Sequence, residues 1–284
     1  MAIIIDGKKI SAQIKDEVRE GTAALAAQGI TLTLAVVQVG EDPASTVYVR
    51  NKQKACEYTG IVSVKIAMPE ETTQEELLSR IKELNADPGV NGILVQLPLP
   101  KGLNADEVIR AISPLKDVDG FHPQSVGALS IGLPGFKSCT PAGIIELIRR
   151  TGIETEGKEC VIVGRSNIVG KPMAMMMMRE NATVTVAHSR TADLPGVCRR
   201  ADILITAVGK AKMFGRDYVK PGAAVIDCGM NRDENGKLCG DVDYEDVFPV
   251  ASAITPVPGG VGPMTVAMLM KNCLESARIQ GLVR

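Results

Sequence analysis

The sequence predicts an α/β fold made of two doubly wound units, and two observations favour this. Apolar strand-like runs alternate with amphipathic helix-like runs along most of the 284 residues, which is typical of parallel βαβ units in a covered sheet. Residues 116–140 are rich in glycine and proline and carry few long apolar runs, so we expect the junction between the units there. The chain is long enough for two medium domains.

The first unit is expected to contain three strands, over residues 32–39, 62–67 and 92–97. Asp42 followed by Pro43 marks the start of a helix, and Gly60 marks its end. Thr72 or Thr73, each with a glutamate three residues later, predicts a capping box before an apolar helical stripe. Two more helices are predicted over 12–27 and 105–112.

The second unit is expected to repeat this alternation. A helix over 141–150 is followed by strands over 160–163, 183–187, 203–207 and 223–227, with helices between the first three strands. A strand over 251–254 and a helix over 266–279 then flank a segment of glycines and prolines. Pro263 in that segment suits the first position of the last helix, where its missing N–H costs nothing.

Composition excludes several classes of protein. Apolar residues make up 45% of the chain, charged residues 23%, and the net charge is −1, as in a soluble globular protein. With no basic tract and no Trp, we expect no nucleic-acid partner. No apolar run reaches membrane-spanning length, and Asp6 comes too early for a signal peptide. Seven widely spaced cysteines without Cys-x-x-Cys predict reduced thiols in a cytoplasmic protein and no metal site.

The second unit contains a pattern that suits a nucleotide. The strand ending at Val163 runs into Gly164-Arg165-Ser166 and then a helix, an arrangement that binds phosphate. It lacks G-x-G-x-x-G, so an ordinary βα turn is the alternative. The next strand ends in His188-Ser189-Arg190, where an NAD site would carry an acid. Arg and Ser suit a 2′-phosphate instead, so NADP is favoured over NAD, although Arg190 alone could be a solvated surface residue.

The first unit carries the reactive candidates. Tyr48 and Lys52 lie four residues apart on a predicted helix and share a face. A partly desolvated lysine there suits proton transfer; the alternative is a surface lysine lying along a tyrosine ring. Gln96 ends a buried strand, where open α/β sheets bind ligands. In the turn Lys116-Asp117-Val118-Asp119-Gly120, one acid is expected to cap the turn and the other to face a ligand.

Residues 255–265 hold three glycines among several prolines. Glycines at these positions would let a flat ligand lie directly on bare backbone. The alternative is a well-built turn from strand to helix.

These motifs together resemble a known family. Tyr48–Lys52, Val95–Pro100, Lys116–Gly120, Gly164–Pro172 and Thr255–Thr265 occur in this order in the bifunctional methylenetetrahydrofolate dehydrogenase/methenyltetrahydrofolate cyclohydrolase family. The resemblance covers essentially the whole chain. Asp227–Asn231 also resembles the family's Asp-x-Gly-x-Asn strand end, with Met230 where the family usually has an aliphatic residue.

The resemblance implies a folate-binding catalytic α/β domain over 1–139 plus 264–284 and a Rossmann-like NADP-binding domain over 140–263, with the C-terminal helix returning to the first domain. It implies oxidation of 5,10-methylenetetrahydrofolate by NADP⁺, then hydrolysis of the methenyl product to 10-formyltetrahydrofolate. Such an enzyme serves one-carbon metabolism, including purine biosynthesis. A cytoplasmic homodimer is the family expectation.

The resemblance also implies a role for each candidate residue. Lys52 would move protons, Gln96 would hold Lys52, Tyr48 would orient the folate ring, and Asp119 would accept the pterin N–H donors. The other expected folate contacts are Val95, Leu97, Pro258, Gly259, Gly260, Val261 and Gly262. The expected NADP contacts are Gly164, Arg165, Ser166, Ser189, Arg190 and Met230.

Two other classes of function stay open at this point. One is a dehydrogenase for a non-folate substrate, of amino-acid or shikimate type, with Lys52 as its acid–base group; the run from Val95 to Pro100 argues against it. The other is a non-catalytic nucleotide-binding protein. The presence of Tyr48, Lys52, Gln96 and Asp119 together argues against that one.

Overall fold

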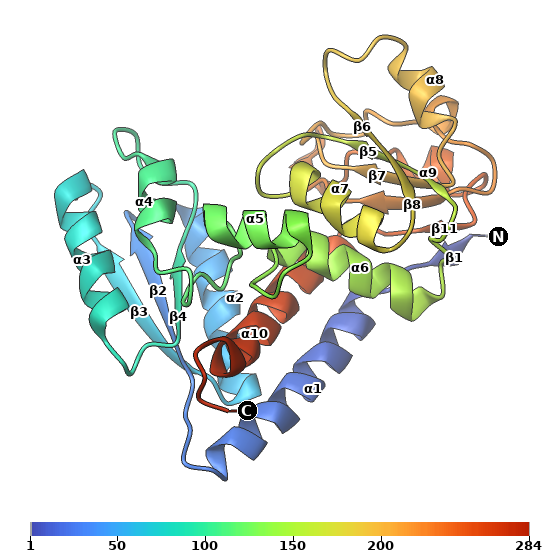
Figure 1. The fold of residues 1–284 in the computed structure, drawn as a ribbon. Helices are drawn as coiled ribbons and strands as arrows, with labels where there is room; N and C mark the ends of the chain where they lie inside the picture. Colours follow the sequence, from blue (N-terminus) through green and yellow to red (C-terminus); the bar gives the residue numbers. More distant parts are fainter. Residues whose placement is uncertain (1, 284) are drawn as a thin grey trace. The chain divides into compact units, whose positions relative to one another are not determined.

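The computed structural model describes residues 2–283 and confirms the α/β class, with all strands of both main sheets parallel (Figure 1). The chain divides into two compact units. We call them the three-stranded unit (13–137 and 266–283) and the six-stranded unit (2–12 and 138–265). Two of the three boundaries between them fall within helix α1 (Gly7–Ala26) and helix α10 (Val261–Ile279), and the third lies between residues 137 and 138.

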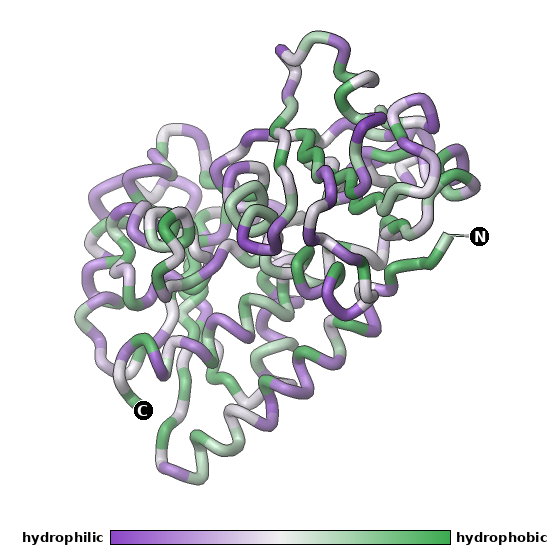
Figure 2. The backbone as a smooth tube through the Cα atoms, turned by 45° about the vertical axis from the view of Figure 1, so that its right-hand side comes forward, coloured by the Kyte–Doolittle hydropathy of each residue, from purple (hydrophilic) through white to green (hydrophobic). Residues whose placement is uncertain are grey.

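The three-stranded unit has the strand order β3-β2-β4. Its strands are β2 (Thr33–Val39), β3 (Val62–Met68) and β4 (Gly92–Val95). Its other helices are α2 (Pro43–Thr59), α3 (Gln74–Ala86), α4 (Ala105–Ala111) and α5 (Pro123–Ile131). A buried cluster joins the sheet to α3 and α4 through residues such as Val37, Ile93, Leu77, Ile81 and Val108. Figure 2 shows hydrophobic and hydrophilic residues alternating along the helical coils, as in helices with one face toward a core.

Local signals at the helix ends work as the sequence predicts. The Asp42 carboxylate accepts a hydrogen bond from the Ser45 amide at 2.7 Å, and Gly60 ends α2 in the left-handed conformation. Thr73, and not Thr72, caps α3, and its backbone N–H donates to Glu76 in a complete capping box. These contacts satisfy backbone groups that a helix end leaves unpaired.

Residues 116–140, where the scarcity of apolar runs predicts the junction between the units and no helix, contain the helix α5. This helix begins at Pro123, and the imidazole of His122 accepts from the Gln124 amide. Gly132 ends it in the left-handed conformation. With only nine residues and no clear apolar stripe, α5 has a weak periodic signal; Pro123 and Gly132 were the usable clues.

The six-stranded unit has the order β1-β11-β8-β7-β5-β6. Its strands are β1 (Ile3–Ile4), β5 (Glu159–Val163), β6 (Thr183–Ala187), β7 (Ile203–Thr206), β8 (Ala224–Asp227) and β11 (Ala253–Ile254). A small antiparallel pair joins β9 (Asn231–Arg232) to β10 (Leu238–Cys239). The helical segments are α6 (Cys139–Thr151), α7 (Gly170–Arg179), α8 (Leu194–Cys198), η1 (Arg216–Tyr218) and α9 (Tyr244–Val247).

The first residues of the chain lie elsewhere than expected. Ile3 and Ile4 pair in parallel with Ala253 and Ile254, so residues 2–12 group with the six-stranded unit, whereas the sequence placed 1–12 in the first domain. A two-residue strand is too short to show any period.

Helix α10 begins in one unit and ends in the other. It starts at Val261, so the prediction that Pro263 is the first helical residue was wrong by two positions. Proline is tolerated there because the first four N–H groups of a helix lack partners within it. Further along, the Asn272 amide donates to the Val118 and Lys137 carbonyls at 2.8 and 2.9 Å, which attaches the helix to the three-stranded unit.

Most cysteines, and several methionines of helix α7, lie in the interior. All seven cysteines lie within the described residues and form no disulfide there, and six of them are buried. Met173, Met176 and Met177 of α7 are buried, while Met178 is exposed, which fits core packing. Within residues 2–283 no group of three or more His, Cys, Asp or Glu could hold a metal ion. None of the helices in this range is long and apolar enough to span a membrane.

Candidate functional site

A lysine–amide contact forms the centre of the candidate site in the three-stranded unit. Lys52 lies in the middle of α2, and Gln96 directly follows β4. The Lys52 ammonium donates to Gln96 Oε1 at 3.0 Å, and both side chains are half-buried. The Gln96 amide nitrogen donates to the Leu97 carbonyl, beside the cis Leu97–Pro98 peptide. The amide oxygen is thereby directed at Lys52, so two residues 44 positions apart form one polar pair.

The acidic turn completes this group. Asp117 is buried and caps the turn, accepting from the Phe121 and His122 amides and from the Ser125 hydroxyl. Asp119 has a different environment: burial raises its pKa to about 6, while the charge of Lys52 acts to lower it. As predicted, one acid serves the turn; the other interacts with the lysine.

Tyr48 lies one helical turn before Lys52 on α2 and is 39% exposed. Partial burial raises the pKa of its phenol. One turn after Lys52, the Cys56 thiol is buried, and burial raises its pKa to about 11, so this thiol is inert as a nucleophile. The helix thus changes along one face from an accessible ring, through a half-buried amine, to the core.

The structure qualifies the role expected of Val95. Its side chain is 6% exposed and packs in the core cluster between the sheet and α3–α4. Only its backbone is therefore available to a ligand. Leu97, in contrast, is half-buried, and its carbonyl is already occupied by Gln96.

In the six-stranded unit, the predicted nucleotide residues lie at one edge of the sheet. Val163, Ala187 and Thr206 are in register at the carboxyl ends of β5, β6 and β7. Chain order reverses between β5 and β7, which is the position where open α/β sheets bind ligands. The turn after β5 and the turn after β6 therefore leave the sheet side by side.

The turn after β5 is built for close approach. Gly164 has a φ of 137°, and a β-carbon there would lie 2.5 Å from the Ala207 carbonyl oxygen. Ser166 Oγ accepts from the Val169 and Gly170 amides at the start of α7, at 3.1 and 3.3 Å. Such a glycine turn before a helix start fits a phosphate group.

The end of β6 is a compact exposed turn. The Arg190 amide donates to His188 Nδ1 at 3.1 Å, and the His188 amide donates to the Thr191 hydroxyl. His188 is thus a turn residue. Ser189, Arg190 and, across the edge, Arg165 are exposed, so their side chains are available to an anion.

The glycine–proline segment belongs to the six-stranded unit, whereas Lys52, Gln96 and Asp119 belong to the three-stranded one. The Val257–Pro258 peptide is cis, and the Gly259 carbonyl accepts from the Lys8 amide at 3.1 Å. The Met230 methyl group lies 3.1 Å from where a β-carbon of Gly262 would be. The structure therefore places Met230, an expected NADP contact, beside Gly262, an expected folate contact.

Sequence reasoning missed a pair of buried carboxylates near Met230. Asp227 ends β8, and Asp241 follows β10; both are nearly or fully buried. In the sequence, only the strand-end motif that contains Asp227 indicates a function for this region. Asp241 gives no pattern in sequence because its partners are mainly backbone N–H groups.

Two protein-family models together match most of the chain. The model for the tetrahydrofolate dehydrogenase/cyclohydrolase catalytic domain matches residues 5–119. The model for the NAD(P)-binding domain of the same family matches residues 138–281. The "Bifunctional protein FolD" of Lachnoclostridium phytofermentans is 63% identical over 278 residues, covering 98% of this chain and 99% of that protein.

Solved structures agree with this. The bifunctional FolD dehydrogenase/cyclohydrolase of Campylobacter jejuni superposes with a TM-score of 0.97 at 49% identity, covering 99% of this chain and 100% of that one. The Trypanosoma brucei enzyme, solved with NADP and an inhibitor, gives 0.93 at 37% identity, covering 100% and 99%. Shikimate dehydrogenase from Thermus thermophilus gives 0.55 at 16% identity over 87% of this chain and 99% of that one, a likeness of fold alone.

Proposed function

Because the chain belongs to the tetrahydrofolate dehydrogenase/cyclohydrolase family, we propose that it oxidises 5,10-methylenetetrahydrofolate with NADP⁺ and hydrolyses the methenyl product to 10-formyltetrahydrofolate. The observation that carries the proposal is the group formed by Lys52, Gln96 and Asp119. It combines an amine held at 3.0 Å from an amide oxygen with a carboxylate in a desolvated position.

The hydrolysis step needs proton transfer, and Lys52 is the group that supplies it. Water adds to the carbon between the two folate nitrogens, loses a proton, and the bond from that carbon to N5 breaks. Lys52 Nζ exchanges protons with the water and the leaving nitrogen, while Gln96 fixes its position through their hydrogen bond. Tyr48, one turn away and partly exposed, orients the folate ring.

Asp119 suits recognition of the folate. A carboxylate accepts two parallel N–H donors, which an aminopyrimidinone ring offers. Its burial raises the cost of ionisation and strengthens any hydrogen bond it accepts. Within the six-stranded unit, we propose separately that the backbone of residues 258–262 (Pro258, Gly259, Gly260, Val261 and Gly262) offers a bare surface to a flat ligand.

The nicotinamide cofactor supplies the hydride acceptor when bound. The chain's residues fit it, because Gly164 leaves room for close approach and Ser166 shapes the helix start. Arg165, Ser189 and Arg190 are exposed at the same edge and would hold phosphates. The end of β6 carries no acid there, which favours a 2′-phosphate and therefore NADP over NAD. Met230 would contact the cofactor near the glycine–proline segment.

We also propose that the protein is a cytoplasmic homodimer. Support comes from β3, which is an edge strand of seven residues. Val62 and Val64 on this strand are 45% and 42% exposed. An edge strand with apolar side chains readily pairs with another copy of itself. The proposed domain assignment is folate binding by the three-stranded unit and NADP binding by the six-stranded unit.

A spectrophotometric assay tests the proposed reactions. With methylenetetrahydrofolate and NADP⁺, we expect NADPH absorbance to appear. With methenyltetrahydrofolate alone, the methenyl chromophore should decay faster than without protein. Absence of change with any folate, while another substrate such as a hydroxy acid reduces NADP⁺, would instead favour a dehydrogenase of another specificity.

A further inference from the structure

Asp241 occupies an unusual position for a carboxylate. It is fully buried and accepts four hydrogen bonds. Its Oδ2 accepts from the Val208 and Gly209 amides at 2.7 and 3.2 Å. Its Oδ1 accepts from the Lys210 amide and from the Asn231 side chain, both at 2.9 Å. One side chain thus satisfies three consecutive backbone N–H groups and an amide from a second segment.

The two segments that Asp241 joins lie at the carboxyl edge of the six-stranded sheet. Residues 208–210 follow β7, which borders the position where strand order reverses. Asn231 follows β8 and is adjacent to Met230. Ligands of open α/β sheets bind beyond these strand ends, so the carboxylate joins two segments at the edge where such a ligand would bind.

Asp227 makes this arrangement rigid. Its carboxylate accepts from the Gly229, Asp241 and Val242 amides at 2.8, 3.0 and 2.9 Å. Its own amide donates to the Thr255 hydroxyl at 2.7 Å. Asp227 therefore fixes the backbone of Asp241, and it also reaches the first residue of the glycine–proline segment.

We propose that Asp241 is a positioning residue for the nicotinamide cofactor, because it holds the segment after β7 and the segment containing Met230 in the arrangement that receives the ligand. It acts through these segments and does not itself touch the ligand. The inference rests on the proposed NADP-dependent function and adds to it a residue outside the recognised motifs.

The variant Asp241→Asn tests this. An asparagine has nearly the same shape, but its NH₂ group would face two N–H donors in either orientation of the amide. We expect the Kd for NADPH, followed by NADPH fluorescence, and the KM for NADP⁺ to rise by about tenfold or more. Hydrolysis of methenyltetrahydrofolate, which needs no NADP, should stay within about twofold of the parent. Equal losses in both activities would overturn the proposal in favour of general destabilisation.

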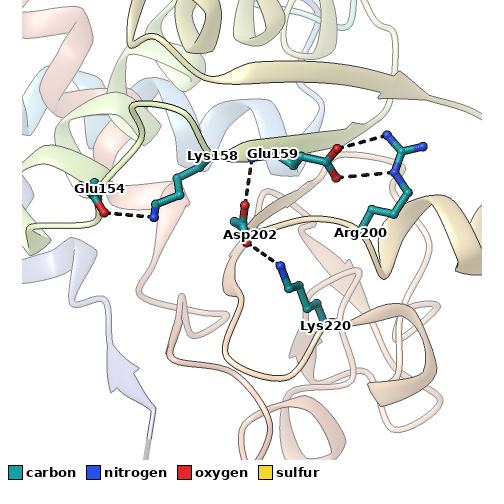
Figure 3. Close-up of polar contacts among 6 residues, drawn as sticks. All are labelled: Glu154, Lys158, Glu159, Arg200, Asp202 and Lys220. Carbon is teal, nitrogen blue, oxygen red and sulfur yellow. Dashed lines mark hydrogen bonds and ion pairs between the residues drawn. The ribbon is translucent and has the colours of Figure 1, made fainter.

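Asp202→Asn is the matched control. Asp202 directly precedes β7, at the amino ends of the strands of the same sheet. There it accepts from the Glu159 amide at 3.0 Å and from Lys220 at 2.7 Å (Figure 3). Two ion pairs lie beside it at the amino ends of β5 and β7, one between Lys158 and Glu154 and one between Arg200 and Glu159. We expect Asp202→Asn to lower the melting temperature without changing the Kd for NADPH by more than about twofold. An equal rise in Kd for both variants would overturn the proposal.

A milder variant covers the case in which Asp241→Asn does not fold. Asn231→Ala removes one of the four donors to Asp241 and should raise the Kd for NADPH by a few-fold, with methenyltetrahydrofolate hydrolysis retained. An unchanged Kd in a folded Asp241→Asn or, failing that, in Asn231→Ala contradicts the proposal. If the parent protein binds no NADPH, it is the proposed function that fails.

Discussion

Replacing Lys52 by methionine separates the two proposed reactions. Methionine keeps the length of the aliphatic stem but removes the ammonium that donates to Gln96 Oε1 at 3.0 Å. It also removes the positive charge that acts to lower the pKa of Asp119, so that pKa should rise above about 6. Near neutral pH a larger part of Asp119 would then be protonated and would accept folate donors less well.

The magnitude follows from the role of the lysine. A positioned proton-transfer group contributes on the order of 10²- to 10⁴-fold to a rate. We therefore expect cyclohydrolase kcat to fall by at least about 100-fold, or about 2.7 kcal/mol in activation free energy. Hydride transfer moves no proton, so the dehydrogenase kcat should fall by less than about tenfold, mainly through misplacement of the substrate.

The assay follows methenyl decay and NADPH formation separately for the parent, Lys52→Met and a control. Lys54→Met is the matched control, since Lys54 lies on the same helix and is exposed; both of its activities should be unchanged. Retention of more than a third of the cyclohydrolase rate in Lys52→Met would remove the lysine from the mechanism. An equal fall in both rates would refute its role in proton transfer.

Three further predictions concern charge, cofactor and assembly. Asp119→Asn should raise the free energy of unfolding by roughly 1–3 kcal/mol at pH 8, because burial raises the folded-state pKa to about 6 from 3.8. Ionisation of Asp119 therefore lowers stability as pH rises between these values, and urea unfolding should show no gain below about pH 4. Arg190→Ala should raise the KM for NADP⁺ about tenfold and leave that for NAD⁺ unchanged; equal effects in steady-state kinetics would contradict a 2′-phosphate contact. Val64→Asp on the β3 edge should convert dimer to monomer in light scattering, whereas Val186→Asp, at an exposed position on the edge strand β6, should not. A monomeric parent would contradict the proposed interface.

Much of the architecture could be predicted because its signals are local. The strand over residues 183–187 was located at its true bounds, and Asp42, Thr73 and Gly60 marked helix ends correctly. Features that depend on distant partners could not be found this way. Strand β1 exists only because Ile3 and Ile4 pair with residues 250 positions away, and a pair of residues carries no periodic signal.

In the candidate site, too, features with a local signal could be predicted and features that depend on distant partners could not. The family resemblance implies the contact between Lys52 and Gln96, and the tight turn predicts that Asp117 and Asp119 have different roles. Asp241 was not predictable, because its role lies in backbone donors supplied by residues 208–210. A sequence shows the side chains that act on a ligand more readily than those that shape the backbone around it.

The central claim is that one chain carries both reactions. The most direct measurement supplies the parent protein with methylenetetrahydrofolate and NADP⁺ and follows NADPH, the methenyl chromophore and 10-formyltetrahydrofolate in one reaction. We predict that NADPH and the sum of methenyl and formyl products rise together, with the formyl form accumulating, and that in Lys52→Met the methenyl form accumulates instead. Formation of NADPH without accelerated conversion of methenyl to formyl product in the parent, or no NADPH at all, would contradict it.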